Sequence, residues 1–531
     1  ATGELALEKG DFAMAGREFD EGLKKHPEDS DLHCGRARAF AGSDRREMGL
    51  SLEAALKANP RHVPSLLLLA EHHIDGEAYD DALKTLEDLR KANPHHPEAW
   101  ALRAVIAHLR NDPMSEADAR TAALRFWPEN PRVPHLMGRM LSQKYRFAEG
   151  AALQREAVAW DPTCVPCKAQ LANDLLRLGD DAEGWDLVQE VHAADGYDVT
   201  AYNLTTLRDT MFGFTTLSNA HFIVRMHTNE AGIYGNRVMD VLERARSQLV
   251  PKYGATLQEP TTVEIFPDPK DFGVRTFGMP DNPGYLGVCF GRVITANSPA
   301  SSRGKSVNWE AVLWHEFCHV VTLQLTRNKM PRWLSEGISV YEERLANPAW
   351  GEQLNPQYRE MILGEDLTPV SRLSAAFLTP KSGLHLQFAY YQSSLVVQFL
   401  LDRFGLEKLR AVLDDLGQGV FINTALEKHT TDMETLESEF AAFARRTAEA
   451  LGPNVAWDRP KPTRGRVLPE IPSILSTGRT NFWALSAQAK SLVDSRRWDE
   501  ALPLLKELLD HYPGQTGPDS AHALIAQIHR E

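Results

Sequence analysis

The sequence predicts a mostly helical protein in which an array of helical repeats precedes an α+β domain. Three observations support this fold class. Prolines recur at a nearly constant interval from residue 27 to residue 162. Short runs typical of β-strands appear only after about residue 205. From about residue 307 to 450 the apolar residues follow helical spacing, and strands followed by helices form an α+β pattern.

The recurring prolines mark the ends of successive repeats. They stand 33, 34, 34 and 34 residues apart, at Pro27, Pro60, Pro94, Pro128 and Pro162. Each follows a helical run, and proline stops a helix. The period, with small and large residues such as Gly3, Ala15 and Phe19 in the expected places, resembles the tetratricopeptide repeat (TPR). The resemblance implies a TPR α-solenoid over residues 1–204 that recruits or positions a protein partner.

Two further segments complete the expected organisation. Residues 451–480 are rich in Pro and Gly and are expected to form a linker. Residues 481–531 return to a TPR-like pattern and predict a short helical hairpin. The pattern of the first repeat would begin before Ala1, so we expect that a leader has been removed.

The middle of the chain, residues 205–450, has no repeat period. Three runs predict strands, at 221–227, 262–268 and 285–297. The amphipathic run 237–254 predicts a helix between the first two.

A second predicted helix, "NWEAVLWHEFCHVVTLQLT" at residues 308–326, carries a candidate metal site. His315 and His319 are four residues apart and therefore share one face of the helix, where two imidazoles can bind one metal ion. Glu316 points beside that face, as a general base for an activated water must. Glu336, on the next helix, supplies a third ligand and leaves a fourth position open. Two solvated histidines on a surface helix are the alternative, which the surrounding apolar residues disfavour.

The motif H-E-x-x-H followed by W-L-x-E-G-x-x-x-Y-x-E resembles the gluzincin clan of metallopeptidases, which includes thermolysin and the zinc aminopeptidases. The resemblance covers roughly residues 220–450 and implies a thermolysin-like domain with one Zn²⁺ bound by His315, His319 and Glu336. Glu316 would be the catalytic base. Sixteen residues separate His319 from Glu336, fewer than in the best-known members, which suggests a divergent branch. Together with the TPRs, the motif resembles bacterial TPR-containing, peptidase MA-like proteins.

The resemblance also implies a donor to the oxyanion of the transition state. Tyr390 matches the aminopeptidase pattern best, with Tyr391 as the second candidate and His385 as the third. After Glu336, the residues expected to support the metal ligands are Ser339, Tyr341, Glu342 and Glu343. Cys318, inside the motif, is expected to be a packed thiol.

Substrate binding can be predicted in outline. The run "GRVITANSP" at residues 291–299 is a candidate edge strand that pairs with an extended substrate. The aminopeptidase segment Gly-x-Met-Glu-Asn, which holds a free amino end, has no counterpart in this sequence. This favours an endopeptidase. The alternatives are a zinc aminopeptidase and a TPR scaffold with an inactive peptidase-like binding domain.

Composition limits the partners and the compartment. The net charge of −14 argues against nucleic acid, which is bound by basic surfaces. No uncharged apolar run approaches the roughly 18 residues of a membrane span. The pair Cys164 and Cys167 is either a local disulfide or two packed thiols. A disulfide and a removed leader would indicate the cell envelope, the periplasm or the outside of the cell, and the cytoplasm is the alternative.

Overall fold

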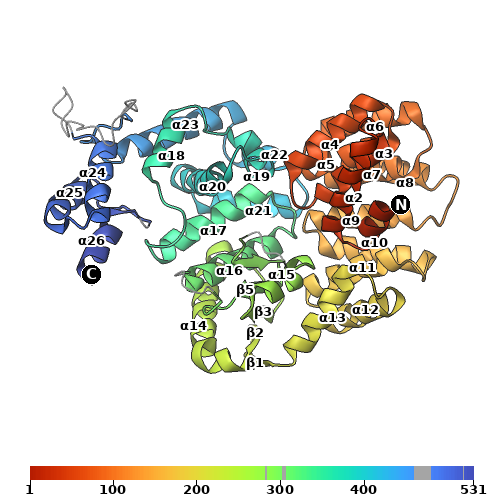
Figure 1. Ribbon diagram of the computed structural model, residues 1–531, viewed down its shortest axis with the longest axis horizontal. Coiled ribbons are helices and arrows are strands. Elements are labelled where there is room, and N and C mark those ends of the chain that lie inside the picture. Colours follow the sequence, from red (N-terminus) through yellow and green to blue (C-terminus); the bar gives the residue numbers. More distant parts are fainter. Residues whose placement is uncertain (281–283, 302–306, 460–479, 518) are drawn as a thin grey trace.

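A computed structural model describes residues 1–280, 284–301, 307–459, 480–517 and 519–531. Figure 1 shows an N-terminal helical array at one end, a central part that contains a small sheet, and a C-terminal group of helices at the other end. The predicted fold class, mostly helical with TPR-like repeats around an α+β part, is confirmed.

The array consists of six antiparallel helix pairs and one further helix. These are α1 (Thr2–Glu8), α2 (Phe12–Lys25), α3 (Ser30–Phe40), α4 (Arg45–Ala58), α5 (Val63–Asp75), α6 (Tyr79–Ala92), α7 (Pro97–Leu109), α8 (Pro113–Ala123), α9 (Arg132–Gln143), α10 (Phe147–Trp160), α11 (Val165–Leu178), α12 (Asp181–Ala194) and α13 (Val199–Met211). The five prolines each follow the second helix of a pair, as predicted.

Small residues let the helices of the array approach closely. A Cβ atom on Gly35 would lie 2.2 Å from the Phe19 ring, and one on Gly3 would lie 2.9 Å from it. The turns within successive pairs also repeat. Left-handed residues stand at Glu77, Asn111, Tyr145 and Gly179, each 34 residues after the last.

The described strands form one five-stranded sheet, in the order β1-β2-β3-β5-β4. They are β1 (Phe214–Ser218), β2 (Phe222–His227), β3 (Thr261–Phe266), β4 (Gly287–Cys289) and β5 (Val293–Asn297). β2, β3 and β5 run parallel, and the outer strands β1 and β4 are antiparallel to their neighbours. The run predicted as one strand at 285–297 is therefore a hairpin, which turns at Gly291 with φ of 103°. β1 was not predicted.

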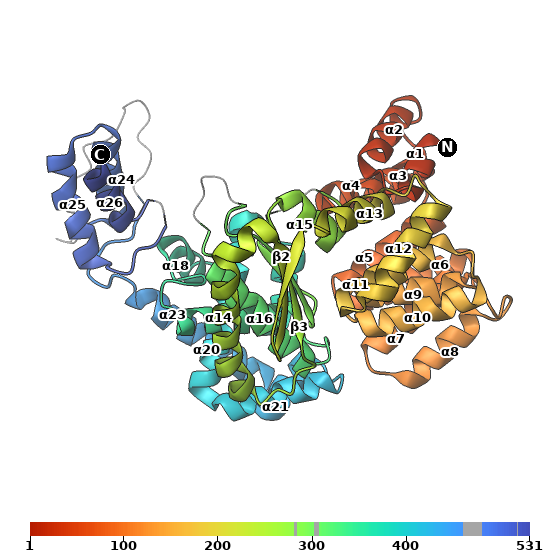
Figure 2. The same ribbon diagram turned by 90° about the horizontal axis from the view of Figure 1, so that it is seen from below.

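The two faces of the sheet pack against different partners. Helices α14 (Thr228–Tyr253) and α16 (Trp309–Leu325) cover one face (Figure 2), where the ring of Phe222 contacts that of Phe317. The other face packs against α15 (Pro269–Phe277) and against the end of the array. Phe147, Leu176 and Trp185 of the array share a hydrophobic cluster with Phe266 and Val293 of the sheet. The array therefore contributes to the core around the sheet.

Helices form the rest of the central part, as predicted. They are α17 (Arg332–Ala346), α18 (Pro356–Leu363), the 3₁₀ turn η1 (Val370–Arg372), α19 (Leu373–Leu378), α20 (Gly383–Phe404), α21 (Leu406–Gly417), α22 (Ile422–His429) and α23 (Met433–Ala450). The C-terminal helices are α24 (Phe482–Asp494), α25 (Trp498–His511) and α26 (Ala521–Arg530), which share a separate hydrophobic core.

Other sequence predictions have mixed outcomes. Cys164 and Cys167 are joined by a disulfide. Residues 460–479, most of the predicted linker, lie outside the described residues. The division at residue 204 stays a prediction, and α13 runs across it. Within the described ranges, no helix has both the length and the apolar character needed to cross a membrane.

Candidate metal centre

Two neighbouring helices bring three predicted ligand atoms together. His315 and His319 extend from one face of α16, and Glu336 extends toward them from the second turn of α17. The two imidazole Nε2 atoms are 3.0 Å apart. Glu336 Oε2 lies 3.2 Å from Nε2 of His315 and 3.3 Å from Nε2 of His319.

This triangle of atoms fits a tetrahedral metal ion. Zinc binds histidine nitrogen and carboxylate oxygen at about 2.0–2.2 Å, so two of its ligand atoms lie about 3.3 Å apart in a tetrahedron. The three edges of 3.0, 3.2 and 3.3 Å agree with that spacing. Three ligands also leave a fourth position for water or substrate, which is the arrangement of catalytic zinc sites.

The outward nitrogen of each imidazole is held by a second group. The Nδ1–H of His315 donates to the carboxylate of Glu343. Glu343 and the ligand Glu336 both extend from the same face of α17. Nδ1 of His319 lies 2.8 Å from the Ser335 hydroxyl and 3.2 Å from that of Ser339. These contacts orient both Nε2 lone pairs toward the triangle, as metal-binding histidines require.

Charge at the centre favours a cation. Burial acts to lower the pKa of His315, but the carboxylates of Glu343 and Glu336 raise it well above the usual value. Burial acts to raise the pKa of Glu336, but the two histidines and Arg332 hold it well below the usual value. The carboxylates of Glu316, Glu336 and Glu343, all of low exposure, thus lie around the two imidazoles, and a divalent cation would offset two of their three negative charges.

Glu316 lies beside the three ligand atoms and is not one of them. It is 7% exposed, and burial raises the pKa of its carboxyl group. It packs against the edge strand β4, where a Cβ atom on Gly287 would lie 2.9 Å from Glu316 Oε1. Within the described ranges, no donor forms a hydrogen bond with its carboxylate. Among the described residues, no donor therefore competes with a water molecule for this carboxylate.

Of the three candidates for an oxyanion donor, only Tyr390 reaches the centre. Its hydroxyl lies 3.4 Å from Glu336 Oε1 and accepts a hydrogen bond of 3.0 Å from Arg332 Nη2. Arg332 Nε in turn donates to Glu336 Oε1 at 3.2 Å. Tyr391 is buried in the core and stacks on Tyr358. His385 pairs with Asp366.

The prediction for the edge strand was wrong. Residues 293–297 form β5, which lies between β3 and β4. The turn at Gly291 folds β4 back along its outer side, so β4 is the edge strand. β4 is also the strand that contacts Glu316 through Gly287.

The expected supporting residues divide into two groups. Ser339 and Glu343 contact the histidines, as above. Glu342 instead contacts Tyr253 and Lys252, and Tyr341 lies near the Lys252 ammonium, with 5.4 Å between that ammonium and the ring centroid. Cys318 is a buried free thiol in the core.

Sequence reasoning missed two residues near the centre. Ser335 lies one helical turn before Ser339, and this spacing could have indicated it. Tyr145 comes from the array, and no sequence signal connects it to the site. Burial raises the pKa of its hydroxyl to about 12, with the charge of Arg332 lowering it and that of Glu336 raising it, although the residue is partly exposed.

Comparisons with models of protein families agree with this organisation. Residues 243–446 match the family model "Peptidase MA superfamily", and residues 51–106 and 486–529 match two models of the tetratricopeptide repeat. Among solved structures, the chain is similar to the crystal structure of the P58(IPK) TPR domain, at 13% identity over 76% of this chain and 98% of that one, with a TM-score of 0.18. No curated protein matches. The chain thus has a Peptidase MA superfamily domain together with tetratricopeptide repeats.

Proposed function

We propose that the protein is a zinc-dependent metallopeptidase of the gluzincin type, and that it cleaves peptide bonds within a chain. The observation that carries this proposal is the triangle of His315, His319 and Glu336, with Glu316 beside it. The match to the Peptidase MA superfamily supports peptidase chemistry. We extend the proposal to a bacterial member, in line with the resemblance described for the sequence.

In the proposed mechanism three side chains hold the metal, Glu316 transfers a proton and Tyr390 stabilises the oxyanion. When bound by His315, His319 and Glu336, Zn²⁺ would polarise a water molecule and the carbonyl of the peptide. Glu316 accepts a proton from that water and later donates it to the leaving amine. Burial of Glu316 favours this role, because a raised pKa suits a group that must both take and return a proton.

Tyr390 is the proposed donor to the oxyanion. Arg332 donates to the phenol oxygen, so the Tyr390 proton can point toward the centre. A hydrogen bond that strengthens as charge develops on the carbonyl oxygen stabilises the transition state more than the substrate.

An extended substrate would add to the outer edge of β4. Backbone pairing there would align the scissile bond beside Glu316, since Gly287 of β4 touches that carboxylate. Strand pairing needs residues on both sides of the scissile bond, which favours an endopeptidase over an aminopeptidase.

The repeats are proposed to recruit or position a protein partner or substrate. The disulfide between Cys164 and Cys167 supports an oxidising compartment, such as the cell envelope or the outside of the cell. The cytoplasm remains the alternative.

The test combines metal content with cleavage. The intact chain should bind one zinc and cut internal bonds in a mixed peptide library, as read by mass spectrometry. Glu316→Gln should keep the zinc and lose cleavage, and His315→Ala should lose both. Cleavage retained in Glu316→Gln would refute the mechanism. Zinc without cleavage of any peptide would favour a scaffold, and release of single N-terminal residues would identify an aminopeptidase.

A further inference from the structure

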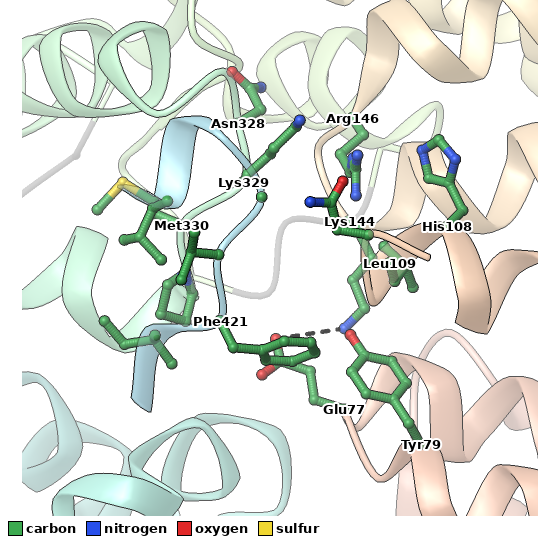
Figure 3. A pocket seen from close by; sticks show the side chains of 16 residues that line it. Glu77, Tyr79, His108, Leu109, Lys144, Arg146, Asn328, Lys329, Met330 and Phe421 are labelled. Atoms are coloured by element: carbon green, nitrogen blue, oxygen red, sulfur yellow. Dashed lines mark ion pairs between the residues drawn. The ribbon is translucent and has the colours of Figure 1, made fainter. Parts of the chain in front are cut away.

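A second site lies where the array meets the central part. A cavity of about 110 Å³ opens between the turns of the array and two loops, residues 328–331 and the α21–α22 connection. The array side includes Glu77, His108, Lys144 and Arg146, whereas the opposite wall carries Lys329. Figure 3 shows Lys329 extending toward the Arg146 side of the cavity, while Lys144 pairs with Glu77.

Two cations in this cavity have hydrogen-bonding capacity that the described residues do not satisfy. The Arg146 side chain is 10% exposed, and its Nη2 pairs with Glu149 at 2.8 Å. Its Nε is buried and has no hydrogen-bond partner. For the Lys329 ammonium, no acceptor lies within hydrogen-bonding distance in the ranges that the structure describes. Burial and the nearby charge of Arg146 lower the pKa of Lys329, while the charge of Glu149 acts to raise it.

The charges around the cavity do not balance. The hydrogen bonds that His108 donates to Glu116 and Glu149 raise the pKa of its imidazole to about 9, so His108 is a cation at neutral pH. The cations are then His108, Lys144, Arg146 and Lys329, against the anions Glu77, Glu116 and Glu149. Four positive charges face three negative ones, and a single added carboxylate would neutralise the excess.

The cavity also lies next to the candidate metal centre. Residues 328–331, one of its walls, lead directly into α17, whose first residue Arg332 contacts Glu336. Tyr145 lies between Lys144 and Arg146 in the chain. The charge of Arg332 lowers the pKa of its hydroxyl and the charge of Glu336 raises it. The Asn328 side chain ties the two walls together, because its Nδ2 donates to the Tyr145 carbonyl at 2.6 Å.

We propose that this cavity is an anion subsite that binds a carboxylate of a peptide held at the metal centre, with Lys329 and Arg146 as the binding cations. The carboxylate is either the C-terminus of the peptide or an Asp or Glu side chain. The inference rests on the proposed function for its substrate, and it adds a preference for acidic peptides. The array would thus take part directly in substrate selection.

The test is a binding measurement that does not require catalysis. Full-length protein carrying Glu316→Gln is titrated, with zinc present, into fluorescently labelled neutral peptides and into counterparts with one Gln→Glu change at successive positions. A second set compares a free C-terminal carboxylate with a C-terminal amide. One of these carboxylates should tighten binding by about tenfold, and the effect should weaken as salt is added. The set that responds identifies the source of the carboxylate.

Variants then locate the effect. When Lys329→Gln is added to the Glu316→Gln protein, the ratio of the affinities for acidic and neutral peptides should fall below twofold. Arg327→Gln removes an exposed cation from the same turn, one that does not line the cavity, and should leave the preference unchanged.

The proposal is overturned if acidic and neutral peptides bind alike, including the case in which neither binds. It is also overturned if the preference persists in Lys329→Gln. A preference that Lys329→Gln removes, in a protein whose unsubstituted form cleaves no peptide, would keep this subsite and reject the peptidase. Cleavage of peptides without any preference for acidic ones would support the peptidase and reject this subsite.

Discussion

The contact between Glu343 and His315 allows a quantitative test of the metal centre. Glu343→Gln keeps the shape of the side chain and an oxygen acceptor, but it removes the charge that faces the Nδ1–H of His315. Losing such an outer contact typically lowers metal affinity 10- to 100-fold. That range corresponds to about 1.4–2.7 kcal/mol. We expect the upper half of the range, because the Glu343 side chain is only 10% exposed and its charge is poorly screened.

The neighbouring residue provides the matched control. Glu342 is the same residue type on the same helix and is also buried, but it contacts Tyr253 and Lys252. Zinc dissociation constants would be measured for the two Gln variants by competition with a chromogenic chelator at fixed pH. Thermal melts of the metal-free proteins would show any loss of stability separately. Equal zinc affinities in Glu343→Gln and Glu342→Gln would refute the reasoning, since only one of them touches a histidine.

Three further predictions concern activity and pH. Tyr390→Phe should lower kcat about 10²- to 10³-fold with KM and zinc content little changed, and kinetics on a cleaved peptide would check it; an unchanged kcat would exclude the oxyanion role. Burial raises the pKa of Asp174 to about 7, so the folded state binds an extra proton between about pH 4 and 7 and loses stability as pH rises through that range. Urea titration should therefore find Asp174→Asn more stable by about 1–4 kcal/mol at pH 8 and no more stable at pH 4. The pKa of His108 is raised to about 9, so protonated His108 stabilises the folded state. This contribution is fully present below about pH 6.5 and is lost as the pH rises through 9. After allowing for solvent screening, the loss in the free energy of unfolding should be roughly 1–2 kcal/mol. His108→Gln should flatten that part of a plot of Tm against pH, and an identical slope in both proteins would contradict the prediction.

Local patterns in the sequence predicted the parts that depend on local spacing. The interval of 34 residues predicted the repeats, because each helix pair packs mainly on the next pair. The separation of four residues predicted that His315 and His319 share a face, and Glu336 joins them as the motif indicates. Their roles in binding zinc and in catalysis stay predictions until the experiments above are done.

The remaining features depend on contacts between distant segments, which no local pattern encodes. A tight turn at Gly291 folds β4 back against the outer side of β5, which makes β4 the edge strand of the sheet. Tyr391 was a reasonable alternative to Tyr390 because adjacent residues differ by about 100° around a helix, and only packing decides which one faces the centre. Tyr145 and Arg146 reach the central part through the docking of the whole array.

The shared cluster between the array and the sheet has a consequence for how the chain folds during synthesis. The ribosome completes the array before it makes the first strand, and domains generally fold from the N-terminus onward. Phe266, Phe272, Val288, Phe290 and Val293 would then find Leu176 and Trp185 already in place when the sheet forms. A chain started near residue 205 would leave those five side chains without part of their cover, at a cost of about 5 kcal/mol, which is a large share of the total stability of a typical domain. The array is therefore expected to act as a built-in folding template for the sheet.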